Sequence, residues 1–217
     1  MGSQPQHALH HTVVVVDVSA FGQRPLNPQL EIRRGLYAAL EAAFSDSGLD
    51  WSAAEHEDRG DGVLVLVPAD MPKSRVVGGL PHALLGELRR YNASRKPTAQ
   101  IRLRMAITAG EVHHDERGVV GDDVTLAFRL VNSAPVRDVL AHSTASFALI
   151  VSDRLYDDVV RPDPAMDPDS FRPVDVSVKE VRGRAWLHVS DGGPPPPPPP
   201  PREPTERRPR WRWPRRA

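Results

Sequence analysis

The sequence has 217 residues, which suits one α/β domain with a substantial core and some residues to spare at its ends. It contains no cysteine, so disulfides, thiolate metal sites and cysteine nucleophiles are excluded. The formal net charge is zero, but residues 202–217 hold seven arginines against two glutamates, so the basic character is confined to one end.

Residues 1–9 lack the basic and apolar segments of a secretory signal, and we expect them to be flexible. No apolar run approaches the roughly 20 residues that are needed to cross a bilayer. Together these observations predict a soluble, cytoplasmic protein.

A buried strand and a helix are predicted first. Val13–Asp17 is a run of four valines that ends on an aspartate, which is typical of a strand buried on both faces. Between residues 28 and 44, apolar side chains recur every fourth residue and therefore lie along one face of a helix. Gly48 is expected to end this helix.

Two further strands form a predicted hairpin. Residues 51–57 and 62–67 have strand-like patterns, and the turn between them, residues 58–61, is rich in glycine and aspartate. A second amphipathic helix follows between residues 80 and 91.

A fourth strand is predicted over residues 101–109, where apolar side chains alternate with Arg102 and Arg104. The two arginines are expected to point outward. The order strand-helix-strand-strand-helix-strand is that of the ferredoxin-like α+β fold, in which the helices pack on one face of the sheet.

The remainder of the domain is expected to contain helices at residues 123–132 and 152–160 and a closing hairpin at 175–189. One domain therefore extends over residues 10–190, with a helix and a hairpin added after the ferredoxin-like core.

Residues 191–217 form a predicted disordered tail. The eight consecutive prolines Pro194–Pro201 favour an extended rod, and the arginine and tryptophan run after them lacks the aliphatic residues of a core. Such a run is compatible with binding to an acidic protein, a membrane surface or nucleic acid, and equally with a merely solubilising role.

Two aspartates are the first candidate site residues. Asp17 ends the valine strand, and Asp61 lies in a Gly-Asp-Gly turn of the hairpin. Each alone is ordinary turn chemistry. Carried together to one edge of a sheet, two carboxylates suit Mg²⁺ or Mn²⁺, which keep waters and take substrate phosphates as further ligands.

These segments resemble the metal-binding motifs of the class III adenylyl and guanylyl cyclases. The first family motif reads roughly F-x-D-I-x-G-F-T and is matched at residues 15–22 by V-V-D-V-S-A-F-G, which aligns Phe21 together with Asp17. The second motif ends in I-G-D and is matched at residues 59–61. Both metal-binding aspartates are present.

The resemblance continues through the second half of the chain. The family's W-G-x-x-V-N-x-A-x-R is matched at residues 120–129 by V-G-D-D-V-T-L-A-F-R, and the preceding G-x-V is matched at residues 110–112. Residues 178–181 resemble the late strand that carries a phosphate-binding lysine, which is Lys179 here.

The resemblance implies a nucleotidyl cyclase whose site forms between two protomers of a homodimer. Asp17 and Asp61 of one protomer would hold two Mg²⁺ or Mn²⁺ ions, and Arg129 of the other would face the reacting phosphate of a nucleoside triphosphate. The ribose 3′-oxygen would attack the α-phosphorus and release pyrophosphate, giving a 3′,5′-cyclic nucleotide.

The sequence departs from the family pattern in the ribose contact and in the pair that reads the base, although glutamate at position 57 resembles the guanylyl cyclases. Thr125 stands where cyclases usually have the asparagine that orients the ribose, and Glu57 and Gly118 stand where adenylyl cyclases have the lysine and aspartate that bind adenine. Because a carboxylate only accepts hydrogen bonds, Glu57 favours guanine or a pyrimidine over adenine. The alternative is a catalytically lapsed domain that binds nucleotide or a partner and signals through its dimer state.

Overall fold

The computed structural model describes residues 8–190, so the interpretation of the tail at residues 191–217 lies outside the described residues. The first strand begins at Leu9, so the last of the nine residues expected to be flexible already belongs to the sheet. Within the described range, no helix is long and apolar enough to span a membrane.

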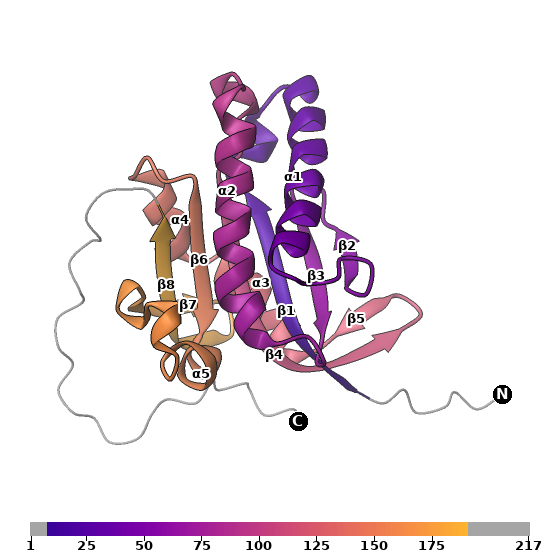
Figure 1. Ribbon diagram of the computed structural model, residues 1–217, viewed down its shortest axis with the longest axis vertical. Coiled ribbons are helices and arrows are strands. Elements are labelled where there is room, and N and C mark those ends of the chain that lie inside the picture. Colours follow the sequence, from indigo (N-terminus) through magenta and orange to yellow (C-terminus); the bar gives the residue numbers. More distant parts are fainter. Residues whose placement is uncertain (1–7, 191–217) are drawn as a thin grey trace.

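One sheet of eight strands forms the centre of the molecule (Figure 1). The strands are β1 (Leu9–Val18), β2 (Glu55–Asp58), β3 (Gly62–Pro68), β4 (Leu103–Asp115), β5 (Gly118–Val120), β6 (Phe147–Ser152), β7 (Arg172–Val178) and β8 (Val181–Ser190). They lie in the order β2-β3-β1-β4-β6-β8-β7, and β5 pairs with β4.

The first half of the chain confirms the expected ferredoxin-like core. Helix α1 (Leu26–Asp46) connects β1 to the β2–β3 hairpin, and α2 (Leu80–Ala93) connects β3 to β4. β1 lies between β3 and β4 and is antiparallel to both. The fold is therefore α+β, with the valine strand at its centre.

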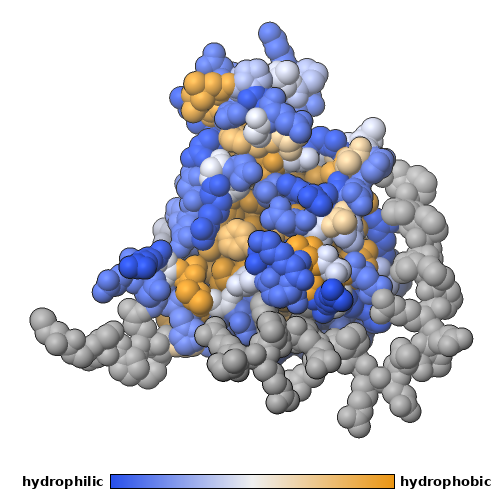
Figure 2. Space-filling model, turned by 180° about the vertical axis from the view of Figure 1, so that it is seen from behind, coloured by the Kyte–Doolittle hydropathy of each residue, from blue (hydrophilic) through white to orange (hydrophobic). Residues whose placement is uncertain are grey.

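Helices cover both faces of this sheet, so the expectation of helices on one face was incomplete. α1 and α2 pack on one face with Val14 and Val16, whereas α3 (Asp122–Val131) and α4 (Ala134–Ala141) pack on the other with Val13 and Val15. Successive side chains of a strand point to opposite faces, which explains why all four valines are buried. Figure 2 views the molecule from the α3 side, where apolar groups lie among polar ones.

Several boundaries and elements differ from the sequence prediction. The second strand begins at Glu55, because the residues before it form turns. The strand β6 and the helix α4 were missed, and the helix expected at residues 152–160 is a short α5 (Asp153–Leu155) continued by a π-helical turn. The closing hairpin is confirmed as β7 and β8.

A long arm extends from the sheet. β4 continues through Asp115 and returns as β5, and Figure 1 shows this hairpin reaching below β3. His114 Nε2 on the arm lies 2.7 Å from Glu55 Oε2 on β2. The arm therefore carries β5 to the edge of the sheet formed by β2.

Candidate active site

The backbone brings Asp17 and Asp61 to the same end of the central strands. Asp17 lies opposite Gly62 in the β1–β3 register, and the N–H of Val18 donates to the carbonyl of Asp61 at 2.8 Å. A Cβ at Gly62 would lie 2.0 Å from the Val16 carbonyl oxygen. Glycine at this position therefore permits the close approach that sets Asp61 beside the end of β1.

Arg104 occupies the space beside this pair. It lies opposite Asp17 in the β1–β4 register, and its guanidinium donates to Asp17 Oδ1. Only 12% of the Arg104 side chain is exposed, so the expectation that it points outward was wrong. The Nε of Arg104 is buried and has no hydrogen-bond partner within the described part of the chain. The site thus contains a fixed positive charge, and the Nε–H of Arg104 has no acceptor among the described residues.

The pKa of Asp17 depends on burial and on both neighbouring charges. Burial raises the pKa of Asp17, the hydrogen bond and positive charge of Arg104 oppose the rise, and the negative charge of Asp61 adds to it. Asp61 itself is exposed. A cation placed between the carboxylates would relieve their repulsion.

These residues fit a magnesium-type ion that arrives with a phosphate substrate. Within residues 8–190 there is no group of three or more histidine, cysteine, aspartate or glutamate side chains able to hold a metal. Mg²⁺ is usually bound by one or two carboxylates and completes its shell with waters and substrate phosphates. Asp17 and Asp61 supply two carboxylates, which is enough for an ion of this kind.

The residues expected to read the base also lie together. A Cβ at Gly118 on β5 would lie 3.5 Å from Glu57 Oε1 on β2. The other carboxylate oxygen of Glu57 accepts a hydrogen bond of 2.6 Å from Arg59, whose guanidinium lies 5.1 Å from the centre of the Phe128 ring. Arg59 was not predicted as a site residue; it lies in the turn just beyond the end of β2.

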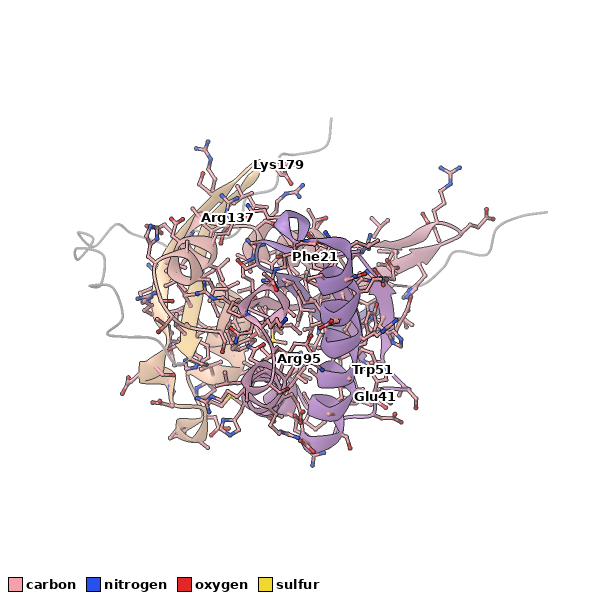
Figure 3. The ribbon with its side chains drawn as sticks, turned by 90° about the horizontal axis from the view of Figure 1, so that it is seen from above. Phe21, Glu41, Trp51, Arg95, Arg137 and Lys179 are labelled. Atoms are coloured by element: carbon pink, nitrogen blue, oxygen red, sulfur yellow. The ribbon has the colours of Figure 1, made fainter. Side chains whose placement is uncertain are left out.

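Helix α3 carries the predicted ribose contact Thr125 and the predicted phosphate contact Arg129. Arg129 and Thr125 are four residues apart and lie on the same face of this helix, both partly buried. The Arg129 Nε and Nη2 lie 3.1 and 3.0 Å from Glu180 Oε1. Glu180 and Lys179 form the turn between β7 and β8, and Figure 3 shows Lys179 at the end of that hairpin.

Glu180 thus forms an ion pair with Arg129 and is the neighbour of Lys179 in the sequence. The N–H of its own backbone lowers its pKa, and Arg129 and Lys179 lower it further. This pairing holds Arg129 within its own chain, which the sequence did not indicate.

Phe21 follows β1 in a single 3₁₀ turn and packs partly buried against the core on the α1 side (Figure 3). The preceding residue, Ala20, has a φ of 56°, a conformation that turns the chain sharply after Asp17. Packing of Phe21 accordingly anchors the loop that follows the first aspartate.

A partly buried aspartate near the start of α3 gives a prediction about stability. Asp123 Oδ2 would be 1.9 Å from a Cβ at Gly110, so the glycine of the G-x-V match makes room for this carboxylate. Burial raises the pKa of Asp123 from 3.8 to about 6. Between these values the folded chain holds more protons than the unfolded chain, so stability falls as the pH rises through this window.

Asp123→Asn is expected to raise the Tm by several degrees at pH 8, since the shift corresponds to at most about 3 kcal/mol. The advantage should vanish below about pH 4, where the carboxyl is protonated in both states. Thermal unfolding at the two pH values checks this, with Asp70→Asn, a change at an exposed aspartate beyond β3, as control. The same Tm difference at both pH values would refute the assignment.

Comparison with known proteins identifies the fold. No protein-family model and no curated protein matches the sequence. Among solved structures, the guanylyl cyclase Cya2 superposes with a TM-score of 0.59 at 17% identity, covering 89% of this chain and 98% of that chain. The guanylate cyclase domain of RhGC from Catenaria anguillulae, in complex with GTP, has a TM-score of 0.53 at 18% identity, with 85% and 98% covered.

An adenylate/guanylate cyclase/hydrolase from Silicibacter pomeroyi is similar to the same extent, with a TM-score of 0.55 at 17% identity and coverage of 85% of this chain and 98% of that chain. The chain therefore has the fold of the adenylyl and guanylyl cyclase catalytic domains. This confirms the fold that the motif resemblance implied.

Proposed function

We propose that this protein is a metal-dependent nucleotidyl cyclase that converts a nucleoside triphosphate into a 3′,5′-cyclic nucleotide and pyrophosphate. The observation that carries the proposal is the placement of Asp17 and Asp61 at one strand end, beside the buried guanidinium of Arg104. A cluster of this kind has two anionic ligands for a cation and one fixed cation for a phosphate. The likeness of the fold to cyclase catalytic domains also supports the proposal.

The reaction needs two kinds of group at the α-phosphate. Divalent ions bound by Asp17 and Asp61 would supply charge neutralisation and promote loss of the ribose 3′-hydroxyl proton. Arg104, held against Asp17, would supply a fixed positive charge close to the triphosphate. The 3′-oxygen then bonds to the α-phosphorus, and the bond to the β-phosphate oxygen breaks.

A second protomer completes the site in this proposal. Arg129 and Lys179 lie at the far end of α3 and at the β7–β8 turn, each on the surface that a neighbouring chain can reach. In a homodimer, Arg129 would give a fixed positive charge to the transition state, and Thr125 would contact the ribose.

Guanine is the base that fits best opposite Glu57. The free Oε1 of Glu57 can accept from the N1–H and amino group of guanine, while the neighbouring Arg59 guanidinium can donate to its carbonyl oxygen. Uracil and cytosine offer fewer of these groups. Adenine would set its N1 acceptor against the carboxylate, so GTP is favoured and ATP is disfavoured.

The proposal is tested by incubating the purified protein with Mn²⁺ and each of the four nucleoside triphosphates, and measuring cyclic product by mass spectrometry. We expect cyclic product from GTP to exceed that from ATP by about tenfold or more. Preference for ATP would contradict the role of Glu57. Absence of every product would contradict the cyclase itself.

A lapsed cyclase domain is the second candidate. The ion pair between Arg129 and Glu180 and the replacement of the ribose-orienting asparagine by Thr125 favour it, because both weaken groups that the reaction needs. Such a domain would bind GTP with Mn²⁺ without forming product. Equilibrium binding measured beside turnover separates the two candidates.

Glu57→Lys is expected to shift the preference toward ATP by about tenfold, because the carboxylate acceptor becomes a donor facing adenine N1. Gly118 must stay unchanged, since its φ of 135° would strain an aspartate at that position. The ratio of kcat/KM for ATP and GTP is the measurement. Glu41→Lys, which makes the same charge change on an exposed part of α1, is the control and should leave the ratio unaltered.

A further inference from the structure

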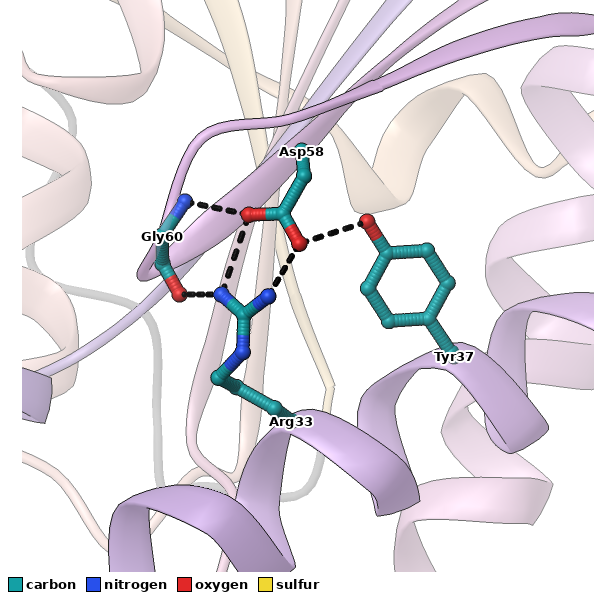
Figure 4. A network of polar contacts seen from close by, with 4 residues as sticks. All are labelled: Arg33, Tyr37, Asp58 and Gly60. Atoms are coloured by element: carbon teal, nitrogen blue, oxygen red, sulfur yellow. Dashed lines mark hydrogen bonds and ion pairs between the residues drawn. The ribbon is translucent and has the colours of Figure 1, made fainter. Parts of the chain in front are cut away.

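The β2–β3 hairpin is tied to helix α1 by a network of polar contacts (Figure 4). Arg33 of α1 donates from Nη1 to Asp58 Oδ1 at 3.0 Å and to the Gly60 carbonyl at 2.5 Å, and from Nη2 to Asp58 Oδ2. Tyr37, one helical turn further, donates to Asp58 Oδ2 at 3.1 Å. The Gly60 N–H donates to Asp58 Oδ1 at 2.6 Å. Both carboxylate oxygens and the turn backbone are thus held.

The residues on either side of this network are those of the proposed site. Glu57 directly precedes Asp58, and Asp61 directly follows Gly60. In the β2–β3 register, Asp58 lies opposite Val63 and Glu57 lies opposite Leu64. Val63 and Leu64 belong to the hydrophobic cores on opposite faces of the sheet. The side chains of Asp58 and Glu57 therefore point to opposite faces of β2. The network therefore holds the hairpin from the α1 side and leaves Glu57 free to face β5.

The contacts are too exposed to be explained by stability alone. The Arg33 and Asp58 side chains are 35% and 41% exposed, and ion pairs of such exposure contribute little to the free energy of folding. Their geometry is nevertheless specific, since a guanidinium fork meets a carboxylate with two parallel hydrogen bonds and adds a third to the backbone. The hydrogen bonds of Arg33 lower the pKa of Asp58 to about 2, so its charge persists throughout the neutral range.

We propose that Arg33 and Asp58 are positioning residues that fix the β2–β3 turn, so that Asp61 faces the metal position and Glu57 faces the base. The proposal rests on the cyclase function proposed above. In the proposed dimer, Asp61 and Glu57 of one chain belong to two different sites. The Arg33–Asp58 network of that chain therefore positions one residue in each of the two sites. Tyr37 supports the Asp58 carboxylate and has the smaller role.

Arg33→Ala tests this positioning. We expect the Mn²⁺ concentration for half-maximal activity and the KM for GTP both to rise by about tenfold, because a small displacement of the turn misplaces both residues. Arg33→Lys should recover only part of the loss, since an ammonium lacks the fork. Tyr37→Phe should change either constant by less than about threefold.

Arg90→Ala is the matched control, because Arg90 joins α2 to Asp46 at the end of α1 by an exposed ion pair of 3.8 Å. It should leave both constants unchanged. A purely structural role for Arg33 predicts a lower Tm with unaltered Mn²⁺ and KM constants, and that outcome would overturn the proposal.

Direct Mn²⁺ binding separates this proposal from the cyclase function. Free Mn²⁺ is measured by electron paramagnetic resonance with the metal alone, for the wild type and for Arg33→Ala. Weaker binding to the variant supports positioning even when the wild type forms no cyclic nucleotide, in which case the proposed function alone fails. Equal binding to the two proteins, including none to either, contradicts the positioning role.

Discussion

Replacement of Asp61 by asparagine is expected to lower cyclase turnover by at least about a hundredfold while the Tm stays within about two degrees of the wild type. The side chain is exposed, so its loss removes a metal ligand and little packing. Asp70→Asn is the matched control, because Asp70 is an exposed aspartate beyond the opposite end of β3. Retained turnover in Asp61→Asn would refute the metal assignment.

A substitution of Asp17 is harder to interpret than one of Asp61. Asp17→Ala also removes turnover, but it leaves the largely buried Arg104 without its carboxylate partner. An unpaired buried donor of this kind costs about 1–3 kcal/mol, so activity and stability would fall together. Asp17→Asn keeps a hydrogen-bond acceptor and is the better variant.

Mixing Asp61→Ala with Arg129→Ala is expected to restore activity that neither variant has alone. In the proposed dimer the two residues serve the same site from different chains, so a mixed dimer has one intact site and one doubly damaged site. With equal amounts and random pairing, about half of the dimers are mixed, which gives about one quarter of wild-type activity. The assay is turnover as a function of mixing ratio.

If mixed dimers form but no activity is restored, the two residues do not share a site. Mixed dimers are detected independently by native mass spectrometry of two chains that differ in mass. Asp61→Ala mixed with Asp17→Ala is the control, since both changes damage the same half of the site and no mixed dimer has an intact one.

The fold of the first half was predictable because each element has a local signal. The four valines of β1 and the glycines that flank Asp61 each act through their own neighbours in sequence. β6 has six fully buried residues without alternation, a pattern shared by buried strands and short helices, so it was missed. α4 begins at Ala134 and has only eight residues, which leaves little periodicity to detect.

The approach of Asp17 and Asp61 was predictable from the hairpin that follows the first strand, but the contacts of the arginines around them were not. The pairing of Arg104 with Asp17 depends on the register between β1 and β4, and that of Arg129 with Glu180 depends on the packing of α3 beside the β7–β8 turn. Neither register nor packing is encoded in the spacing of the residues concerned. Arg59 lies just beyond the end of β2, so its contact with Glu57 depends on the conformation of the turn.

The position of β2 at the edge of the sheet makes the two halves of the site unequal in rigidity. β1 has a hydrogen-bonded neighbour on each side and a core on each face, whereas the four residues of β2 pair with β3 alone. Amide protons of β1 should therefore exchange with solvent only when the whole domain unfolds, and those of β2 during local opening. Asp17, the first proposed metal ligand, thus lies on the strand that we expect to exchange most slowly, whereas Glu57, the proposed base-selecting residue, lies on a strand that we expect to open locally. Substitutions that retune base choice can then accumulate in β2 without disturbing the strand that carries Asp17.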